Sequence, residues 1–296
     1  MAGAEPWRGE GRPGAGGTPN RPSHDGDEPP AALTPPASAE RTGSTSARYV
    51  AIITDGNGRW ARARGLPINA GHEAGADTVK ARLRDAVDLG IEELTVYSFS
   101  TENWSRSPTE VQGLFEMFSR RIAGETPELH AEGVRMRFIG RREGVPEELR
   151  EQMRWAEELT GANSTITLFV AFNYGGRAEI VDAARRFAAR MEALSNGAGE
   201  ASHGVEPHGE ASPGAEPRGS KSDEEEFRRC LYAPEMHDPD LIVRTSGERR
   251  LSNYLLWQSA YSELVFREEL WPDFTRAALE QSLAEFSARR RRFGGR

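Results

Sequence analysis

The chain has 296 residues, a formal net charge of −8, a hydrophobic fraction of 37% and a single cysteine. The acidic balance argues against nucleic acid as a partner, and the lone Cys230 excludes an internal disulfide or a metal site built from several cysteines. Because no apolar run reaches about 18 residues and no hydrophobic signal core is present, we expect a soluble, cytoplasmic protein.

Two segments have compositions that do not favour packing. Residues 1–47 are rich in glycine, proline, serine and charge and contain almost no aliphatic side chains, and residues 195–225 share this composition. Such segments bury too little apolar surface to offset the entropy lost on folding. We therefore expect a disordered N-terminal tail over 1–47 and a single domain over 48–296, which carries a disordered surface insertion at 195–225.

Strand-like runs alternate with helical patterns along this domain. Strands are expected at 49–54, 94–99, 134–139, 165–172, 240–244 and 263–266. Helices are expected at 72–89, 109–124, 146–160, 176–194, 250–260 and 276–290. In the first of these helices, apolar residues recur at three- and four-residue spacing, and Gly90 follows as a C-cap. The alternation predicts an α/β fold with a central, mostly parallel, six-stranded sheet flanked by helices.

Polar clusters follow four of the expected strands, at 55–59, 100–104, 173–177 and 244–248. The carboxyl ends of parallel strands lie at one edge of a sheet, which is where open α/β sheets bind ligands. We therefore expect one site to gather all four clusters.

The first cluster reads Asp55-Gly56-Asn57-Gly58-Arg59. Its glycines let backbone N–H groups approach an anion, and Arg59 adds a fixed positive charge. Asp55 alone would simply cap the next helix, but beside an anion site it suits a divalent cation that bridges carboxylate and phosphate. This pattern predicts a magnesium-dependent diphosphate site. The alternative is an aspartate-nucleophile phosphatase, although such sites usually have a second aspartate where this chain has Asn57.

His72 lies at the start of the expected helix 72–89. It is expected either to pack structurally or to donate to a diphosphate oxygen or shuttle a proton.

A second group of polar side chains follows the second strand. The hydroxyl, carboxylate, amide, indole and guanidinium groups after the strand favour a site that orients a small anionic substrate, with turn chemistry and core packing as the alternative. These residues are Ser100, Glu102, Asn103, Trp104 and Arg106.

The segment 244–253 is the second phosphate candidate. Two arginines and a serine around a glycine turn can hold a diphosphate through charge-assisted hydrogen bonds, and a solvated run of charge is the alternative. Glu263 stands among aromatic and aliphatic neighbours. It is expected either to pair with an arginine or to hold a cation at the second phosphate site, either in its own subunit or in a neighbouring one. Within the expected domain 48–296, neither GxxxxGK[ST] nor GxGxxG occurs, which argues against ATP and dinucleotides.

Taken together, the motifs resemble those of the cis-prenyltransferases, and most closely the bacterial undecaprenyl diphosphate synthase (isoprenyl transferase) group. The resemblance covers about residues 48–296 and excludes the tail and the insertion. It is carried by Asp55-Gly-Asn-Gly-Arg-Trp, Gly71-His72, Phe99-Ser-Thr-Glu-Asn-Trp, Asn173-Tyr-Gly-Gly-Arg, Arg244 to Asn253, Glu263-Leu264 and Arg291-Arg-Phe-Gly-Gly. The trans-type synthases are excluded because no DDxxD motif is present.

The resemblance implies the role of each matching residue. Asp55 would be the essential Mg²⁺ carboxylate, Asn103 the proton acceptor and Glu263 the second Mg²⁺ contact. The matching substrate-binding positions are Gly56, Asn57, Gly58, Arg59, Trp60, His72, Ser100, Thr101, Glu102, Trp104, Arg106, Arg244, Arg250, Leu251 and Ser252. The family often has an arginine where this chain has Ile68, so one phosphate contact would be missing or supplied by Arg62 or Arg64.

The resemblance also implies the reaction. Isopentenyl diphosphate would condense with an allylic diphosphate, farnesyl or geranyl diphosphate, to give a cis-polyprenyl diphosphate that serves as a lipid carrier for cell-wall synthesis. A short-chain synthase and a catalytically silent scaffold subunit of the same fold are the alternatives. The resemblance further implies a homodimer and peripheral membrane contact during product release.

A growing apolar product would need a dry tunnel. Candidate lining residues, with core packing as an equal alternative, are Leu114, Phe115, Met117, Phe118, Val96, Phe138, Leu168 and Val170. Ser98 is expected beside the tunnel entrance, where its size would influence product length.

Overall fold

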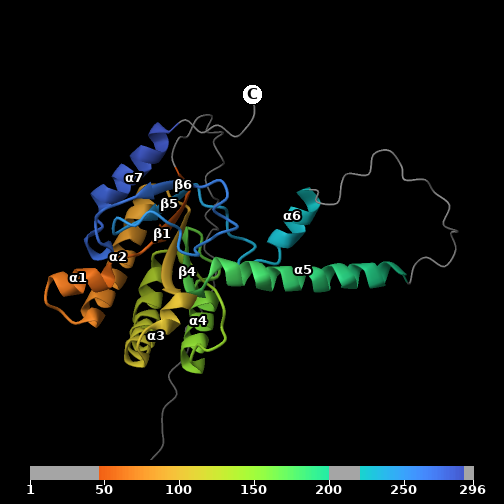
Figure 1. Ribbon diagram of the computed structural model, residues 1–296, viewed down its shortest axis with the longest axis horizontal. Helices are drawn as coiled ribbons and strands as arrows, with labels where there is room; N and C mark the ends of the chain where they lie inside the picture. Colours follow the sequence, from red (N-terminus) through yellow and green to blue (C-terminus); the bar gives the residue numbers. More distant parts are fainter. Residues whose placement is uncertain (1–46, 200–220, 290–296) are drawn as a thin grey trace, which may run out of the picture. The chain divides into compact units, whose positions relative to one another are not determined.

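The fold was analysed in a computed structural model, which describes residues 47–199 and 221–289. Its centre is a six-stranded sheet in the order β3-β4-β2-β1-β5-β6 (Figure 1). The strands are β1 (Tyr49–Ile53), β2 (Glu93–Ser100), β3 (Val134–Ile139), β4 (Ile166–Tyr174), β5 (Leu241–Arg244) and β6 (Glu263–Phe266). Every pair of neighbours is parallel. The predicted fold class and all six predicted strands are therefore confirmed.

Helices complete the alternation that the sequence predicts. They are α1 (Asn57–Ala63), α2 (Ile68–Asp88), α3 (Pro108–Ala131), α4 (Glu147–Thr160), α5 (Gly176–Gly199), α6 (Lys221–Arg228) and α7 (Arg276–Ala288). Two short 3₁₀ helices, η1 (Thr101–Ser105) and η2 (Trp271–Asp273), follow β2 and β6. No helix within the described ranges is long and apolar enough to span a membrane.

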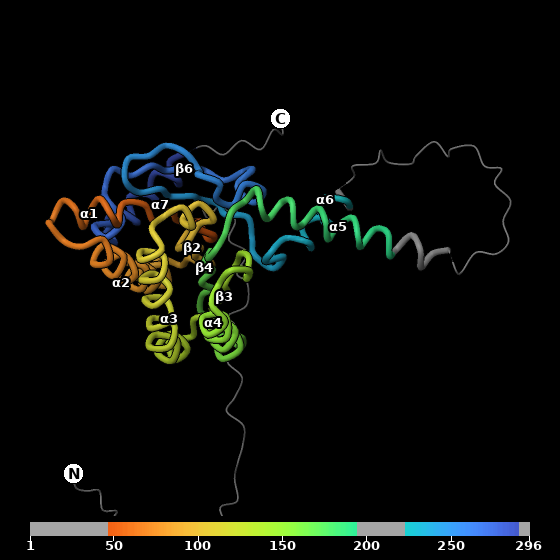
Figure 2. Tube along the Cα trace, turned by 60° about the horizontal axis from the view of Figure 1, so that its bottom comes forward, coloured from red at the N-terminus to blue at the C-terminus, as the bar shows by residue number. Residues whose placement is uncertain are grey.

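The two faces of the sheet are covered differently. Apolar side chains of α2, α3, α4 and α7 pack against Val50, Ile52, Leu94 and Val96 on one face and form the larger core. On the other face, Tyr254 and Leu255 and the segment around Ala233 cover β1 and β5. Figure 2 shows α5 leaving the end of β4 with α6 beside it, and these two helices pack on each other through a small separate cluster.

One predicted helix is wrong. Residues 250–260 form successive turns, and three residues without the freedom of glycine, Ser252, Asn253 and Leu255, have positive φ angles of 48°, 65° and 44°. A right-handed helix requires negative φ at every residue. The three- and four-residue spacing of apolar side chains here comes from a loop that folds back onto the sheet.

The predicted disordered segments lie largely outside the described residues. This holds for the tail up to residue 46 and for 200–220. The closing Arg-Arg-Phe-Gly-Gly motif, which belongs to the predicted domain, also lies outside the described residues. At the predicted insertion 195–225, α5 continues to Gly199 and α6 begins at Lys221, so both ends of that range are helical.

Candidate functional site

The four polar clusters meet at the carboxyl edge of the sheet. Register pairs Ile53 with Arg244 across β1 and β5, and Ser100 with Tyr174 across β2 and β4. Asp55 follows β1 directly, so it lies beside the end of β5 although 189 positions separate it from Arg244. The sequence therefore placed the clusters correctly in space.

Asp55 is held between two arginines. Arg244 Nη2 donates to Asp55 Oδ2 at 2.9 Å, and Arg59 Nη2 donates to Asp55 Oδ1 at 3.3 Å. Burial raises the pKa of Asp55, but hydrogen bonds from Arg244 and Ser246 and the charges of both arginines outweigh it, so the pKa lies below its ordinary value of 3.8. Asp55 is thus an anion throughout the neutral range.

Arg244 is the buried member of this group. Its side chain is only 4% exposed, whereas that of Asp55 is 31% exposed. Its Nη1 donates to Ser252 Oγ at 2.7 Å and to the carbonyl oxygen of Arg250. Its Nε is buried and has no hydrogen-bond partner within the described part of the chain. Arg244 therefore places a buried positive charge directly beside Asp55.

The backbone around Asp55 is fixed by residues that the sequence analysis did not single out. Thr245 Oγ1 donates to the carbonyl oxygen of Asp55 at 2.7 Å and accepts from the Asp55 N–H at 3.1 Å. Arg59 Nη1 donates to the carbonyl oxygen of Ser246 at 3.1 Å. Thr245 and Ser246 belong to the Arg244-Thr-Ser-Gly-Glu cluster, and their position directly after Arg244 is the signal in the sequence that could have identified them.

Glycines let α1 lie close against α2. Gly56, with φ of 117°, ends the turn before α1. A Cβ on Gly71 would stand 2.2 Å from the carbonyl oxygen of Asn57, and one on Gly75 would stand 2.5 Å from its Oδ1. Only glycine therefore allows the Asn57 turn to approach α2, and this approach brings Asp55 and His72 to the same cleft.

His72 forms a second polar group with Arg106 and Glu110. Its Nε2 lies 3.4 Å from Glu110 Oε1 and 3.5 Å from Arg106 Nη1, and Arg106 donates to Glu110 at 2.8 Å. Burial and the charge of Arg106 hold the pKa of His72 below its ordinary value of 6.5, although Glu110 acts in the opposite direction. The imidazole is therefore neutral at pH 7.

The η1 loop is an internally bonded turn. Asn103 Oδ1 accepts the Ser100 N–H at 2.9 Å, and the Ser100 side chain accepts from the Asn103 backbone, which completes a capping box. Trp104 Nε1 donates to Asn173 Oδ1 at 2.8 Å, which ties the loop to β4. The amide oxygen of Asn103 is thus engaged in holding its own loop.

Glu102 and Asn253 join this loop to the arginine segment. Asn253 Nδ2 donates to Glu102 Oε1 at 2.8 Å, and Asn253 Oδ1 accepts the Arg177 N–H at 2.8 Å. Burial raises the pKa of Glu102, but the hydrogen bonds from Asn253, its own backbone, Ser100 and Thr101 bring it below its ordinary value. Asn253 therefore connects three of the four clusters.

Some predicted residues lie at the margin of this arrangement. The Arg250 side chain is 61% exposed and pairs with Glu248. Leu251 is partly buried against the cluster formed around Tyr254 and Leu255. Trp60 Nε1 donates to Asp273 Oδ1 at 2.8 Å, and Arg64 lies over its ring. Arg62 and Ile68, by contrast, line a polar cleft at the Asp55 turn, and Arg64 does not.

Glu263 does not reach Asp55 within the chain. It begins β6 and pairs in register with Leu241, at the opposite end of β5 from Arg244. Its Oε2 accepts from Arg289 Nη1 at 2.8 Å. The two predicted metal carboxylates are thus separated by the length of the strand.

A polar cleft and an apolar cavity meet at the Asp55 turn. The cleft is lined by the turn, Arg59, Arg62, Arg106 and Glu110. The cavity runs between α2, α3 and the sheet, and Thr54, Asn57 and His72 line both spaces. Seven of the predicted apolar residues line the cavity, as does Ser98: Val96, Leu114, Met117, Phe118, Phe138, Leu168 and Val170. Phe115 does not line it, because its ring packs on Phe99, Trp104 and Phe172.

Comparisons with known proteins show which family the chain belongs to. A family model described as "Putative undecaprenyl diphosphate synthase" matches residues 53–294. The isoprenyl transferase of Thermotoga maritima is 46% identical over 248 residues, which are 84% of this chain and 97% of the relative. Isoprenyl transferase 2 of Bradyrhizobium diazoefficiens is 46% identical over 260 residues, 88% of this chain and 95% of the relative.

Solved structures show the same fold. Lavandulyl diphosphate synthase from Lavandula x intermedia, in complex with dimethylallyl diphosphate, superposes with a TM-score of 0.73 at 34% identity over 85% of this chain and 99% of the other. A probable undecaprenyl diphosphate synthase from Campylobacter jejuni gives a TM-score of 0.63 at 27% identity over 84% and 99%. The chain belongs to the undecaprenyl diphosphate synthase family of cis-prenyltransferases and is a prenyl-transferring enzyme.

Proposed function

We propose that the enzyme condenses isopentenyl diphosphate with an allylic diphosphate, farnesyl or geranyl diphosphate, in the presence of Mg²⁺, and releases a cis-polyprenyl diphosphate. The observation that carries the proposal is the junction at Thr54, Asn57 and His72, where an arginine-lined cleft opens onto an apolar cavity. A molecule with a diphosphate head and an isoprenoid tail has the chemistry that such a junction binds.

Asp55 is the residue that fits a magnesium ion. No group of three or more His, Cys, Asp or Glu side chains that could hold a metal occurs among the residues that the structure describes. Mg²⁺ is commonly bound by one or two carboxylates together with substrate phosphates and water, and Asp55, ionised in the cleft, supplies one. When bound, the ion would neutralise the charge that develops on a leaving diphosphate. Glu263 would contribute only in a neighbouring subunit's site, which requires the predicted homodimer.

The arginines supply the remaining positive charge. The N–H groups of the first turn of α1 have no partner within the helix, and they lie beside Arg59 and Arg62 in the cleft. We assign this group and Asp55 to the allylic diphosphate, whose departure leaves an allylic cation. Arg244, with Arg250, Leu251 and Ser252 around it, would hold the isopentenyl diphosphate that stays. Fixed positive charge near a developing anion lowers the barrier to ionisation.

The final step removes a proton from the new carbocation. Asn103 was expected to accept it, but a carboxamide is a weak base and Asn103 Oδ1 already accepts the Ser100 N–H. We therefore assign Asn103 to positioning the η1 loop. A diphosphate oxygen or His72, whose ring is neutral at pH 7 because its pKa is lowered by burial, would accept the proton.

The product would be long enough to act as a lipid carrier for cell-wall synthesis and would contact the membrane peripherally on release. A short-chain product is the second candidate, because the solved relative in complex with dimethylallyl diphosphate is named a lavandulyl diphosphate synthase. Mass spectrometry of products made from geranyl and farnesyl diphosphate distinguishes the two candidates.

The test uses radiolabelled isopentenyl diphosphate with each allylic primer and follows label in a butanol-extractable product. We expect Mg²⁺-dependent incorporation in the wild type and none in Asp55→Ala. Asp88→Ala is the matched control, because Asp88 pairs with Arg276 at the other end of α2. A phosphatase would release inorganic phosphate from the primer without incorporating label. No incorporation by the wild type, or equal turnover in Asp55→Ala, would refute the proposal.

A further inference from the structure

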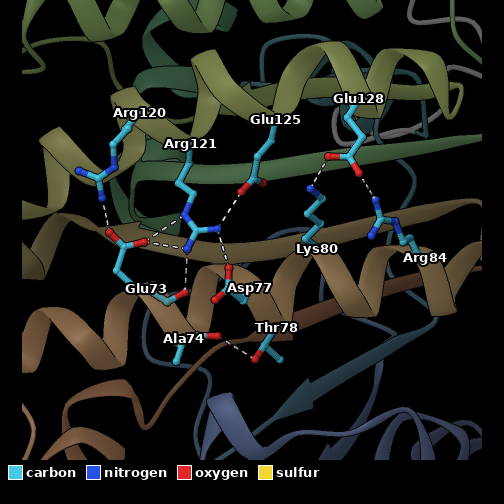
Figure 3. A network of polar contacts seen from close by, with 10 residues as sticks. All are labelled: Glu73, Ala74, Asp77, Thr78, Lys80, Arg84, Arg120, Arg121, Glu125 and Glu128. Atoms are coloured by element: carbon cyan, nitrogen blue, oxygen red, sulfur yellow. Dashed lines mark hydrogen bonds and ion pairs between the residues drawn. The ribbon is translucent and has the colours of Figure 1, made fainter.

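Ion pairs join α2 to α3 along the two helices (Figure 3). Glu73 pairs with Arg120 and Arg121, and Asp77 pairs with Arg121. One to two turns further along, Lys80 pairs with Glu128, and Arg84 pairs with Glu128 and Glu132. These contacts, called the α2–α3 ion pairs below, follow the two helices for about three turns of α2.

Apolar residues of both helices line the cavity. Val79 and Leu83 of α2 and Met117, Ile122 and Leu129 of α3 all line it. The lining also includes three charged residues of the ion-pair region, namely Lys80, Arg121 and Glu125. The α2–α3 ion pairs therefore form the outer wall of the cavity over this stretch.

Arg121 is the residue at the centre of that wall. Its Nη1 lies 2.6 Å from Asp77 Oδ1 and 2.7 Å from Glu125 Oε1. Its Nη2 lies 2.7 Å from Glu73 Oε2 and 3.2 Å from the carbonyl oxygen of Glu73. Its side chain is 23% exposed, whereas that of the neighbouring Arg120 is 65% exposed. Arg120 pairs with Glu73 alone and does not line the cavity, which makes it a matched control.

This wall is weaker than the others. The floor of the cavity is formed by β2, β3 and β4, which are hydrogen-bonded to one another along their length. The ion pairs of the outer wall are partly or largely exposed, and such pairs each contribute little to stability and are screened by salt. Separating α2 from α3 therefore breaks weak contacts, whereas opening the floor would break a sheet.

We infer that the seam between α2 and α3 is a lateral opening of the cavity, held closed by Arg121, through which the apolar tail of a bound diphosphate leaves once it fills the cavity. This inference rests on the proposed function for the identity of the tail. The opening itself depends only on the two helices. Arg121 then helps to set product length, since a closed seam confines the tail to the cavity, whose lining includes Leu129 and Met136.

The first experiment measures the opening without substrate. Cys230→Ser removes the native thiol, and Met136→Cys places a reporter on β3 that lines the cavity. The rate of labelling by methyl methanethiosulfonate is compared in Arg121→Met and Arg120→Met. We expect about fivefold or faster labelling in Arg121→Met, the factor that loss of about one kcal/mol produces, and no change in Arg120→Met. Added NaCl should accelerate labelling in the Arg121-containing protein more than in Arg121→Met.

Glu125→Gln removes one partner of Arg121 while leaving the arginine in place. It should give an intermediate labelling rate, and it serves as the test if Arg121→Met does not fold. Equal labelling rates in all three variants and the parent would overturn the lateral opening.

The second experiment follows products from farnesyl diphosphate and labelled isopentenyl diphosphate. Arg121→Met should shift the products toward longer chains relative to Arg120→Met. A bismaleimide cross-link between cysteines introduced as Lys80→Cys and Glu128→Cys should shift them toward shorter chains. If the wild type makes no product, the proposed function fails, while the labelling ratio still decides whether the seam opens. Faster labelling with unchanged product lengths would overturn the exit of the tail through the seam.

Discussion

Replacing Asp55 with asparagine should separate the binding of a diphosphate from its reaction. In the free enzyme, the Asp55 carboxylate accepts hydrogen bonds from Arg244 Nη2 at 2.9 Å and from Arg59 Nη2 at 3.3 Å. It therefore competes with any anion for these two donors. Asparagine keeps the shape and removes the charge. We therefore expect Asp55→Asn to bind inorganic pyrophosphate more tightly than the wild type when Mg²⁺ is absent, and to lose condensation when it is present.

The size of the effect follows from the geometry. Two unit charges about 4 Å apart interact by about 4 kcal/mol at an effective dielectric constant near 20. Asp55 keeps 31% of its side chain exposed, and solvent screening reduces this to about 1–2 kcal/mol, which corresponds to roughly fivefold to thirtyfold in affinity. The loss of the metal carboxylate should lower turnover by at least about a hundredfold.

Isothermal titration with pyrophosphate in EDTA, followed by the same titration in MgCl₂, measures the first effect. Mg²⁺ should tighten binding to the wild type and have a smaller effect on Asp55→Asn. Arg244→Met should weaken binding under both conditions. If Asp55→Asn binds pyrophosphate more weakly than the wild type without Mg²⁺, the carboxylate does not compete for the arginines and the reasoning is refuted.

Three further predictions concern the residues around Asp55. Burial lowers the pKa of His72 below 6.5. The free energy of unfolding should therefore be highest above pH 6.5, where His72 is neutral in both states, and should fall as pH drops from 6.5 through the pKa of the folded state. Denaturant titrations should show this decrease in the wild type and not in His72→Gln. Gly71→Ala should destabilise the protein by about 1–3 kcal/mol, because its Cβ would stand 2.2 Å from the carbonyl oxygen of Asn57, and an unchanged melting temperature would contradict this close approach. Asn253→Ala removes the hydrogen bond to Glu102; it should raise KM for isopentenyl diphosphate severalfold and raise the pKa of Glu102, measurable by NMR titration, and an unmoved pKa would contradict this contact.

The sequence predicted the parts of the site that depend on strand order. The β-rich runs before Asp55, Ser100 and Arg244 were recognisable because buried parallel strands are nearly continuous in apolar residues. Once they were taken as parallel neighbours, the meeting of the polar clusters followed from geometry alone. No long-range information was needed for this step.

Contacts between distant segments could not be predicted in the same way. The turns at 250–260 were taken for a helix because apolar side chains there have helical spacing. The loop is fixed instead by tertiary hydrogen bonds of Asn253 to Glu102 and Arg177, which have no local signature. The same reason explains Phe115, whose ring packs on Phe99, Trp104 and Phe172. Asn103 differs, because its contact with Ser100 joins residues only three positions apart.

The strand order also determines when the site can form during synthesis. β1 lies between β2 and β5, so until residues 241–244 have left the ribosome it remains an edge strand with unpaired backbone groups. Asp55 then lacks Arg244, which follows 189 positions later. A chain that stops anywhere before β5 can form its first helices and strands, but it cannot bind a diphosphate through this pair. Termination before residue 241 therefore gives a chain without the Asp55–Arg244 pair.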